Sequence, residues 1–352
     1  MHRPLLAAVS AAALVALGAC GDNAGAPATA SGILAVGSST VFPFASRVAE
    51  NFSRTSGGAA PRVESLGTGG GIQKFCEGVG VGTPDIANAS RPMKASEFDL
   101  CAKNGVTEIV EIKIGYDGIV VATARNGGSF DLRLQDLYLG LAKEVPGAGG
   151  AFVANPATTW NQVNASLPAQ RIQVYGPPPT SGTRDAFLEL GMAPGAERIP
   201  ALKALSDSDE DRFETLAHTL REDNAWIDSG ENDNAIVQTL TRTPGSLGVF
   251  GFSFLEQNMD TVKAETIDGV APSVATIADG SYPLARSLYI YVKKQHVGVT
   301  PGLKEFVLEF MSDASAGRGG YLQDRGLVPL PADELAAQRA IATNMTAMTR
   351  PQ

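Results

Sequence analysis

Short apolar strands alternate with helices along most of this 352-residue chain, and the alternation limits the folds it can adopt. Apolar residues from Val41 to Phe52 recur three and four positions apart, which predicts an amphipathic helix with Thr40 in the capping position before it. Farther along, residues 246–255 predict a strand and residues 302–312 a helix. Strands that alternate with helices in this way predict α/β layers with mixed sheets.

The first 19 residues do not follow this pattern. They carry one Arg, a short apolar run and small residues before Cys20, and Leu17-Gly18-Ala19-Cys20 is similar to the lipobox of bacterial lipoproteins. We expect residues 1–19 to be a signal peptide, Cys20 to be lipidated, and residues 20–31 to form a flexible tether. The alternative is an ordinary secretion signal with an incidental Cys, which would leave a soluble periplasmic protein.

The charge balance limits the possible partners. The whole chain has a formal net charge of −9, and loss of the single Arg in residues 1–19 gives −10 for the mature protein. An acidic protein is a poor candidate for binding nucleic acid or an anionic membrane surface. If the protein binds an anion, local hydrogen-bond donors must overcome this unfavourable field.

Two cysteines remain once Cys20 is assigned to lipid. An even pair in an exported chain predicts a disulfide between Cys76 and Cys101, which closes a loop of about 25 residues and contributes about 3 kcal/mol by loop entropy. The alternative is two buried free thiols.

Three loops share one design, in which Gly with Ser or Thr follows a strand and precedes a helix. They are Gly37 to Thr40, Gly67 to Gly71, and Thr180 to Thr183. Unpaired N–H groups at a helix start, close backbone approach at glycine and adjustable hydroxyls together suit a phosphate or a sulfate. For any single loop, ordinary helix capping is the better explanation, but three such loops in one chain favour a shared site.

Charged residues lie beside these loops. Arg91 follows a strand and Arg184 follows Ser181-Gly182-Thr183, and the planar guanidinium suits tetrahedral oxyanions. Asp117 enters an apolar strand, where burial is costly without a partner or a function. Such a carboxylate can accept the proton of HPO4, which sulfate lacks near neutral pH. A surface ion pair of Arg184 with Asp185 or Glu189 is the structural alternative.

An enzyme is the competing class of function, with Ser181 as nucleophile in a phosphoryl-transfer or hydrolytic reaction. The mature chain keeps only His218 and His296 as histidine bases, and both are expected at the surface. No nucleophile elbow, Walker loop or metal-ligand spacing is present, so we expect no enzyme and no metal.

Seven segments, taken in order, resemble the PstS phosphate-binding proteins, which are the periplasmic or lipoprotein receptors of phosphate ABC importers. The resemblance covers residues 31–330, and it is carried by AVGSSTVFPFA, GTGGGIQKFCEG, DIANASRPM, IGYDGIVVA, TSGTRDAFLEL, GVFGFSFLEQN and YPLARSLYIYVKK.

This resemblance implies a two-lobed periplasmic-binding-protein fold of type II, with ligand held in a cleft between the lobes. The strands that cross between lobes are expected near Ile114–Tyr116 and Pro283–Arg286. Lobe 1 is then discontinuous, over residues 32–115 and 285–345, and lobe 2 covers residues 116–284.

The resemblance also implies phosphate ligands in each loop. They are Thr40 through its hydroxyl, Val41 through its backbone N–H, Thr68, and Ser181 with Gly182 and Thr183. The sequence departs from the family in two places: Arg91 stands where some relatives have an acceptor Asp, and Pro177 where some have Arg. We therefore assign the cationic role to Arg91 and Arg184 and the acceptor role to Asp117.

The leading hypothesis is a monomeric receptor that delivers inorganic phosphate to ABC importer permease subunits, with no cofactor. Membrane contact would be through the lipid anchor on the periplasmic face of a bacterial membrane. Alternatives are a receptor for sulfate or molybdate, a hydrolase that uses Ser181, and a lipoprotein that senses or scaffolds after losing ligand binding.

Overall fold

The computed structural model describes residues 32–57, 60–179, 181–230 and 232–352. The predicted signal peptide, Cys20 and the tether lie outside these ranges. No helix within the described ranges combines the length and the apolarity needed to cross a membrane.

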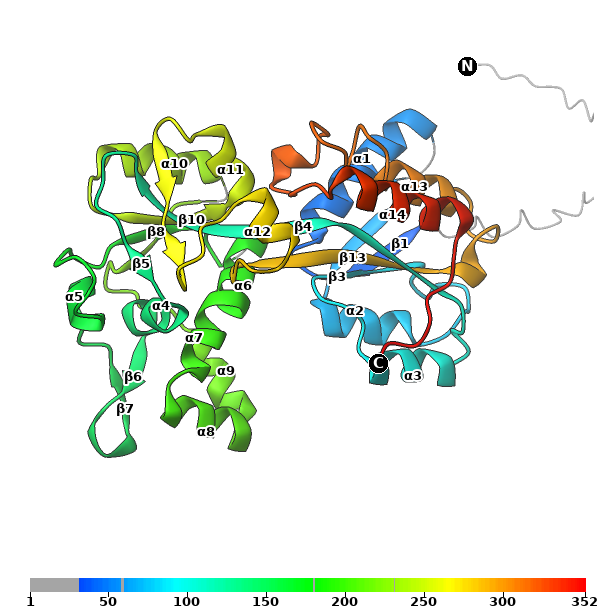
Figure 1. The fold of residues 1–352 in the computed structure, drawn as a ribbon. Helices are drawn as coiled ribbons and strands as arrows, with labels where there is room; N and C mark the ends of the chain where they lie inside the picture. Colours follow the sequence, from blue (N-terminus) through cyan, green and yellow to red (C-terminus); the bar gives the residue numbers. More distant parts are fainter. Residues whose placement is uncertain (1–31, 58–59, 180, 231) are drawn as a thin grey trace, which may run out of the picture.

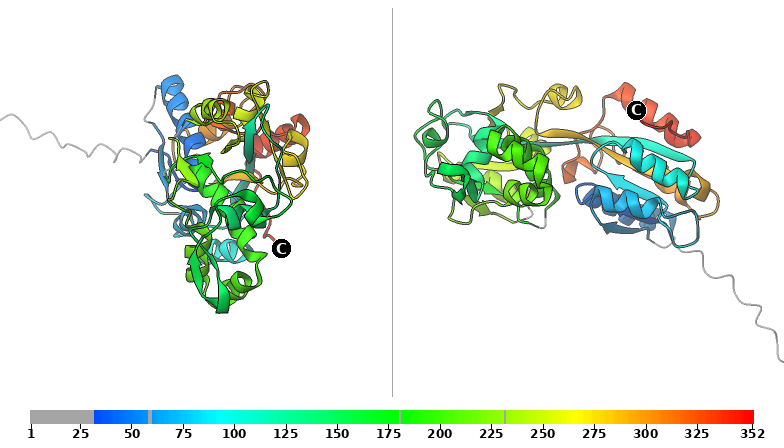
Figure 2. Two further views of the ribbon diagram at one scale, coloured as in Figure 1. Left: turned by 90° about the vertical axis from the view of Figure 1, so that its left-hand side faces the viewer. Right: turned by 90° about the horizontal axis from the view of Figure 1, so that it is seen from below.

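Two lobes lie side by side and are joined by two long strands, β4 (Ile109–Ala124) and β13 (Ala285–Lys293) (Figures 1 and 2). We call the elements before β4 and after β13 lobe 1, and the elements between them lobe 2. Residues 285–293 of β13 pair antiparallel with residues 109–118 of β4, with an irregularity between Leu288 and Tyr289. All but two residues of β4 are buried, which agrees with its nearly continuous apolar sequence.

Lobe 1 has a sheet between two layers of helices. Strands β2, β1 and β3 are parallel, and β13 joins them antiparallel to β3. Helices α1, α13 and α14 cover one face and α2 and α3 the other (Figure 1). The elements are β1 (Leu34–Gly37), α1 (Phe42–Ser56), β2 (Arg62–Ser65), α2 (Thr68–Phe75), β3 (Ile86–Ala89), α3 (Ala95–Lys103), α13 (Leu303–Phe310) and α14 (Ala332–Asn344).

Lobe 2 continues the same path of strands. β10 pairs antiparallel with β4, β8 pairs parallel with β10 and with β9, and β11 also pairs with β4. The strands of lobe 2 are β5 (Asp131–Leu132), β6 (Glu144–Pro146), β7 (Phe152–Ala154), β8 (Val174–Gly176), β9 (Trp226–Asp228), β10 (Leu247–Gly251), β11 (Val262–Ala264) and β12 (Thr266–Ile267). Its helices are α4 (Leu134–Leu141), α5 (Trp160–Val163), α6 (Gly182–Phe187), α7 (Ala193–Glu197), α8 (Pro200–Ser208), α9 (Glu210–His218), α10 (Asp233–Arg242), α11 (Phe252–Gln257) and α12 (Val274–Ala278), with a π-helical turn at Leu188–Met192 between α6 and α7.

The predicted amphipathic helix is confirmed as α1, although its N-cap is Val41 and not Thr40. Phe44, Ala45, Val48 and Ala49 are buried. Phe52 packs edge-on against Phe306 of α13, with ring centroids 5.6 Å apart. The Thr40 hydroxyl does not cap the helix and instead accepts a hydrogen bond from Arg286 of β13 at 2.7 Å.

The predicted strand over residues 246–255 is wrong in its second half. Strand β10 ends at Gly251, and α11 begins at Phe252. The Gly251 N–H donates to a carboxylate oxygen of Asp233 at 3.0 Å rather than to another strand. An apolar run alone does not distinguish a buried strand from a buried helix.

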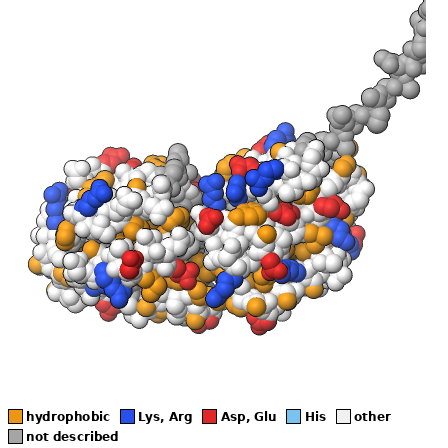
Figure 3. Space-filling view, turned by 90° about the horizontal axis from the view of Figure 1, so that it is seen from above, with side chains coloured by type: hydrophobic (Ala, Val, Ile, Leu, Met, Phe, Trp, Pro, Cys, Tyr) orange, Lys and Arg blue, Asp and Glu red, His pale blue; other side chains and the backbone are white. Residues whose placement is uncertain are grey.

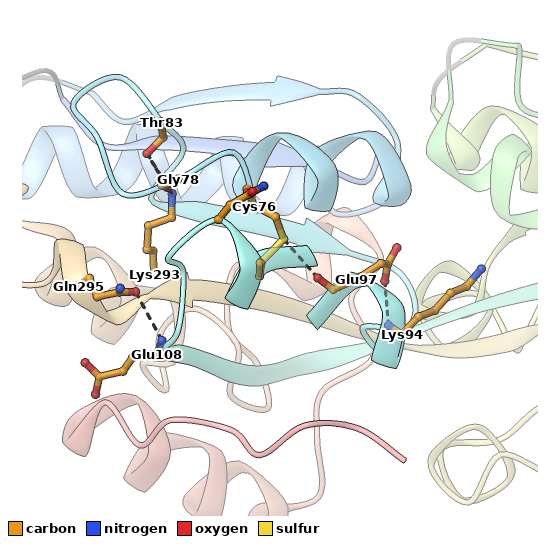
Figure 4. Close-up of a disulfide and its surroundings, with 10 residues drawn as sticks. Cys76, Gly78, Thr83, Lys94, Glu97, Glu108, Lys293 and Gln295 are labelled. Atoms are coloured by element: carbon orange, nitrogen blue, oxygen red, sulfur yellow. Dashed lines mark hydrogen bonds between the residues drawn. A yellow bond between two sulfur atoms is a disulfide. The ribbon is translucent and has the colours of Figure 1, made fainter. Parts of the chain in front are cut away.

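Cys76 is the C-cap of α2, and Cys101 lies within α3; Figure 4 shows Cys76 and its surroundings. The Sγ atoms of Cys76 and Cys101 are 1.93 Å apart and join the end of α2 to α3. The sulfur of Cys76 also lies 3.6 Å from the carbonyl oxygen of Glu97, within α3.

His296 is buried, which corrects the expectation that it lies at the surface. It is 7% exposed, and its Nδ1 lies 2.8 Å from a carboxylate oxygen of Asp85. His218 is half-buried, and its Nδ1 lies 2.9 Å from Glu214, one turn earlier on α9.

Candidate functional site

A cavity of 560 Å³ lies between the two lobes. Figure 3 shows the molecule hollowed between the lobes, with acidic and basic side chains at the edge of the hollow. From lobe 1, the residues that follow β1 and β3 and the start of α2 line the cavity. The π-helical turn of lobe 2 lines the opposite side, and residues of the first half of β13 complete the lining. The polar lining residues are Ser38, Ser39, Thr68, Ser90, Arg91, Glu189, Arg286, Ser287 and Tyr289.

The loops of lobe 1 bring hydroxyls and backbone N–H groups to one edge of the sheet, because β1 and β3 are parallel and both end there. Thr68 Oγ1 lies 3.0 Å from Ser90 Oγ and accepts a hydrogen bond from the Ser90 N–H at 3.1 Å. The Val41 N–H lies 3.4 Å from Ser38 Oγ. The start of α2, at Gly67 to Gly69, forms part of the wall, so its free N–H groups can meet an anion.

The loop of lobe 2 touches the first loop of lobe 1. Ser181 is the N-cap of α6, as the sequence predicts, and its hydroxyl accepts from the Thr183 N–H at 3.3 Å. Gly182 packs so closely on lobe 1 that a Cβ there would lie 3.0 Å from the Ser39 carbonyl oxygen. Ser39 Oγ donates to Asp185 at 2.7 Å across the same junction.

Arg286 is the residue of this site that sequence reasoning missed. It lies on β13, and its side chain is 10% exposed. Its Nη2 donates to Thr40 Oγ1 at 2.7 Å, its Nη1 contacts Glu189, and its Nε lies 3.5 Å from Asp117 Oδ2. One guanidinium on a crossing strand therefore contacts lobe 1 and lobe 2 together. A single Arg among the apolar residues of YPLARSLYIYV is the sequence signal that could have identified it.

Asp117 lies directly opposite Arg286 in the pairing of β4 with β13. Its side chain is buried, and Oδ2 has no hydrogen-bond partner among the described residues. Burial raises the pKa of Asp117, and the nearby charge of Arg286 offsets only part of the rise. The site therefore contains a carboxyl group that is costly to ionise beside a guanidinium that favours its ionisation.

Arg91 lies on the wall of the cavity, and Glu97 binds its guanidinium. Its Nη1 and Nη2 donate to the two carboxylate oxygens of Glu97 at 2.9 and 2.7 Å. The hydrogen bond to Glu97 raises the pKa of Arg91. Burial acts to raise the pKa of Glu97, but the bonds from Arg91 and from the Lys94 N–H outweigh it and lower that pKa.

Of the predicted ligands, Thr68 and Arg91 are on the lining of the cavity, whereas Thr40, Val41, Asp117, Ser181, Gly182, Thr183 and Arg184 are not. Arg184 has partners of its own outside the cavity. Its Nη1 donates to Asp228 at 2.7 Å and to the Pro177 carbonyl at 3.1 Å, and its guanidinium lies over the Trp226 ring at 4.8 Å. The alternative partners considered from the sequence, Asp185 and Glu189, bond to Ser39 and Arg286 instead.

Ser181 lacks the neighbours that a nucleophile requires. Its hydroxyl is engaged by the Thr183 N–H, and the described cavity lining contains no histidine. His296 is bonded to Asp85 in lobe 1, where β1 begins. The arrangement combines hydroxyl, N–H and guanidinium donors around a polar cavity, which is the chemistry of oxyanion binding.

The sequence of this chain is similar to those of known binding proteins. A family model described as a PBP superfamily domain matches residues 22–314. The protein SphX of Synechocystis is 34% identical over 322 residues, which cover 88% of this chain and 82% of SphX. A phosphate-binding protein PstS of Staphylococcus epidermidis is 30% identical over 332 residues, which cover 91% of this chain and 86% of PstS.

Solved structures agree with these relatives. The crystal structure of a possible phosphate-binding protein from Planctomyces limnophilus matches with a TM-score of 0.70 and 27% identity, and the match covers 89% of this chain and 97% of that chain. An ABC-type phosphate transport receptor from Vibrio cholerae matches with a TM-score of 0.53 and 18% identity over 85% of this chain and all of the other, and it supports the fold alone.

Proposed function

Because this chain belongs to the PBP superfamily and, within it, to the PstS phosphate-binding proteins, we propose that it is an extracytoplasmic receptor for inorganic phosphate. It captures phosphate in the cleft and delivers it to an ABC-type importer. The single observation that carries the proposal is Arg286, which contacts Thr40 of lobe 1 and Glu189 of lobe 2 from a strand shared by both. An anion bound there can hold the two lobes together.

The loops of both lobes supply the neutral donors. The Thr40 hydroxyl, the Val41 N–H and Thr68 face the ligand from lobe 1, and Ser181, Gly182 and Thr183 face it from lobe 2. This assignment is supported by the contact of Gly182 with Ser39 and Thr40, which brings the two sets of donors to the same place.

Two arginines supply the positive charge. Arg286 is the central cation, and Arg91 is the second, because both are on the lining of the cavity. Arg184 positions the lobe 2 loop through Pro177 and Asp228 and does not contact the ligand.

Asp117 selects phosphate over sulfate in this proposal. A protonated phosphate oxygen can donate to a carboxylate, whereas sulfate has no proton to donate near neutral pH. The buried Oδ2 of Asp117 supports this role, since it faces Arg286 Nε at 3.5 Å without a well-formed hydrogen bond and can accept one from a ligand.

The export features complete the proposal. The receptor is anchored through a lipid on Cys20 and a tether over residues 20–31, binds as a monomer, and carries a disulfide between Cys76 and Cys101. The two lobes are residues 32–115 with 285–345, and residues 116–284.

Calorimetric titration tests the function most simply. Protein freed of carried-over phosphate by unfolding and refolding is titrated with phosphate, sulfate and molybdate. We expect tight binding of phosphate and much weaker binding of the other two anions. No heat with phosphate together with tight binding of sulfate would show that the receptor serves a different anion.

A further inference from the structure

Glu189 inserts a carboxylate into the cleft from lobe 2. It lies in the π-helical turn between α6 and α7, and its Oε2 contacts Nη1 of Arg286. Its side chain is 51% exposed, whereas that of Arg286 is 10% exposed. A long and half-exposed side chain therefore contacts a guanidinium that is almost fully buried.

Each nitrogen of the Arg286 guanidinium has a different partner, and Nη1 is the one that contacts the Glu189 carboxylate. Nη2 donates to Thr40, and Nε faces Asp117 on the neighbouring strand. A carboxylate and a phosphate bind a guanidinium through the same oxygen geometry. The carboxylate of Glu189 therefore occupies the place on Arg286 where an oxyanion in the cavity would bind.

The charges already present in the cleft determine whether Glu189 can stay on Arg286 when an anion binds. Arg91 is already matched by Glu97, and Arg286 contacts both Asp117 and Glu189. These two cations thus face three carboxylates before any anion enters. Addition of phosphate beside all three would place like charges close together in a partly buried site, which is unfavourable.

The two carboxylates on Arg286 differ in their freedom to move. Asp117 is buried on β4, in register with Arg286, and its side chain is 10% exposed. Glu189 has a longer side chain, and half of it is already in contact with solvent. Glu189 is the carboxylate that can leave.

We propose that Glu189 is a displaceable internal anion, which occupies Arg286 while the receptor is empty and turns to solvent when phosphate takes its place. This inference rests on the proposed function, because it concerns the same cleft. Glu189 keeps the buried guanidinium satisfied in the empty receptor and competes with phosphate for it, so it limits the affinity for phosphate and favours release.

The test compares Glu189→Gln with Glu197→Gln. Glutamine keeps the size of the side chain and removes its charge. Glu197 is an exposed carboxylate on α7 and is absent from the lining of the cavity, so its variant controls for the change in net charge. Phosphate is titrated into each variant by calorimetry, and thermal unfolding checks that each is folded. We expect the phosphate Kd of Glu189→Gln to fall about tenfold and that of Glu197→Gln to stay within about twofold of the wild type.

Titration of phosphate at high salt distinguishes direct displacement of Glu189 from long-range repulsion between Glu189 and phosphate. At about 0.5 M NaCl the Debye length is about 4 Å, so repulsion between separated charges is largely screened. The gain of Glu189→Gln should persist there because the displaced contact is direct. Weaker binding by Glu189→Gln, unchanged binding, or a gain that disappears in high salt would each overturn the proposal. Failure of the wild type to bind phosphate at all would instead reject the proposed function.

Discussion

Replacement of Gly182 by alanine should hold the two lobes apart where they touch. A Cβ at this position would lie 3.0 Å from the Ser39 carbonyl oxygen and 3.0 Å from the Thr40 Cα. Favourable contacts between carbon atoms lie at about 3.5–4.0 Å, so the lobes must separate by about 0.5 Å. Both neighbours are backbone atoms, and no side-chain rotation can relieve the contact.

The cost follows from the hydrogen bonds beside Gly182. Ser39 donates to Asp185 across the junction of the lobes, and Arg286 of the crossing strand β13 donates to Thr40 beside it, each at 2.7 Å. A hydrogen bond contributes about 1 kcal/mol net, and one to a charged group about 1.5–3 kcal/mol. Loss of about 1.5–3 kcal/mol from the closed form weakens phosphate binding about tenfold to a hundredfold.

Calorimetry with phosphate measures this loss, and Gly80→Ala is the matched control. Gly80 has no positive φ, is absent from the lining of the cavity, and a Cβ there would meet no atom within 4 Å, so this variant should bind nearly as the wild type does. Gly182 lies at the first position of a helix with no positive φ, so its own backbone conformation accepts alanine, and thermal unfolding checks that the variant is folded. A folded Gly182→Ala protein with the wild-type Kd would refute the reasoning that the two loops must approach this closely.

Three further variants test other parts of the site and fold. Arg286→Lys should weaken phosphate binding about tenfold or more, because an ammonium lacks the planar fork; wild-type affinity by calorimetry would exclude Arg286 as the central cation. Asp117→Asn should weaken phosphate binding and narrow its advantage over sulfate. Since burial raises the pKa of Asp117 from 3.8, the folded state keeps this proton to higher pH than the unfolded state does, and its ionisation destabilises the fold as pH rises. Asp117→Asn should therefore melt above the wild type at about pH 7, with a difference that shrinks towards about pH 4; a lower melting temperature at neutral pH would contradict this. Replacement of Cys76 and Cys101 by alanine should lower the free energy of unfolding by about 3 kcal/mol in denaturant titrations. Alkylation of both thiols in the unreduced wild type, seen by mass spectrometry, would show that no disulfide exists.

The local elements of this fold could be predicted from the sequence because they depend on neighbouring residues. The spacing of apolar residues from Val41 to Phe52 gives the buried face of α1, and Ser181 caps α6 as its loop indicates. The error at Gly251, where a strand becomes a helix within one apolar run, arose because burial on all sides removes the periodicity that separates the two.

The candidate site was harder to predict because it depends on pairing between distant strands. Arg286 meets Asp117 only through the register of β13 with β4, which no local pattern reveals. The same limit explains Arg184, whose partner Asp228 lies on β9, the strand beside β8. His296 likewise lies in a Lys-rich turn after a strand, yet its contact with Asp85 buries it.

A crystal structure of the protein with phosphate tests the central claim most directly. We expect phosphate in the cleft between the lobes, bonded to the guanidinium of Arg286, to the Thr40–Val41 loop and to the loop from Ser181 to Thr183. Phosphate bound outside this cleft, or bound in it without any contact to Arg286, would contradict the account.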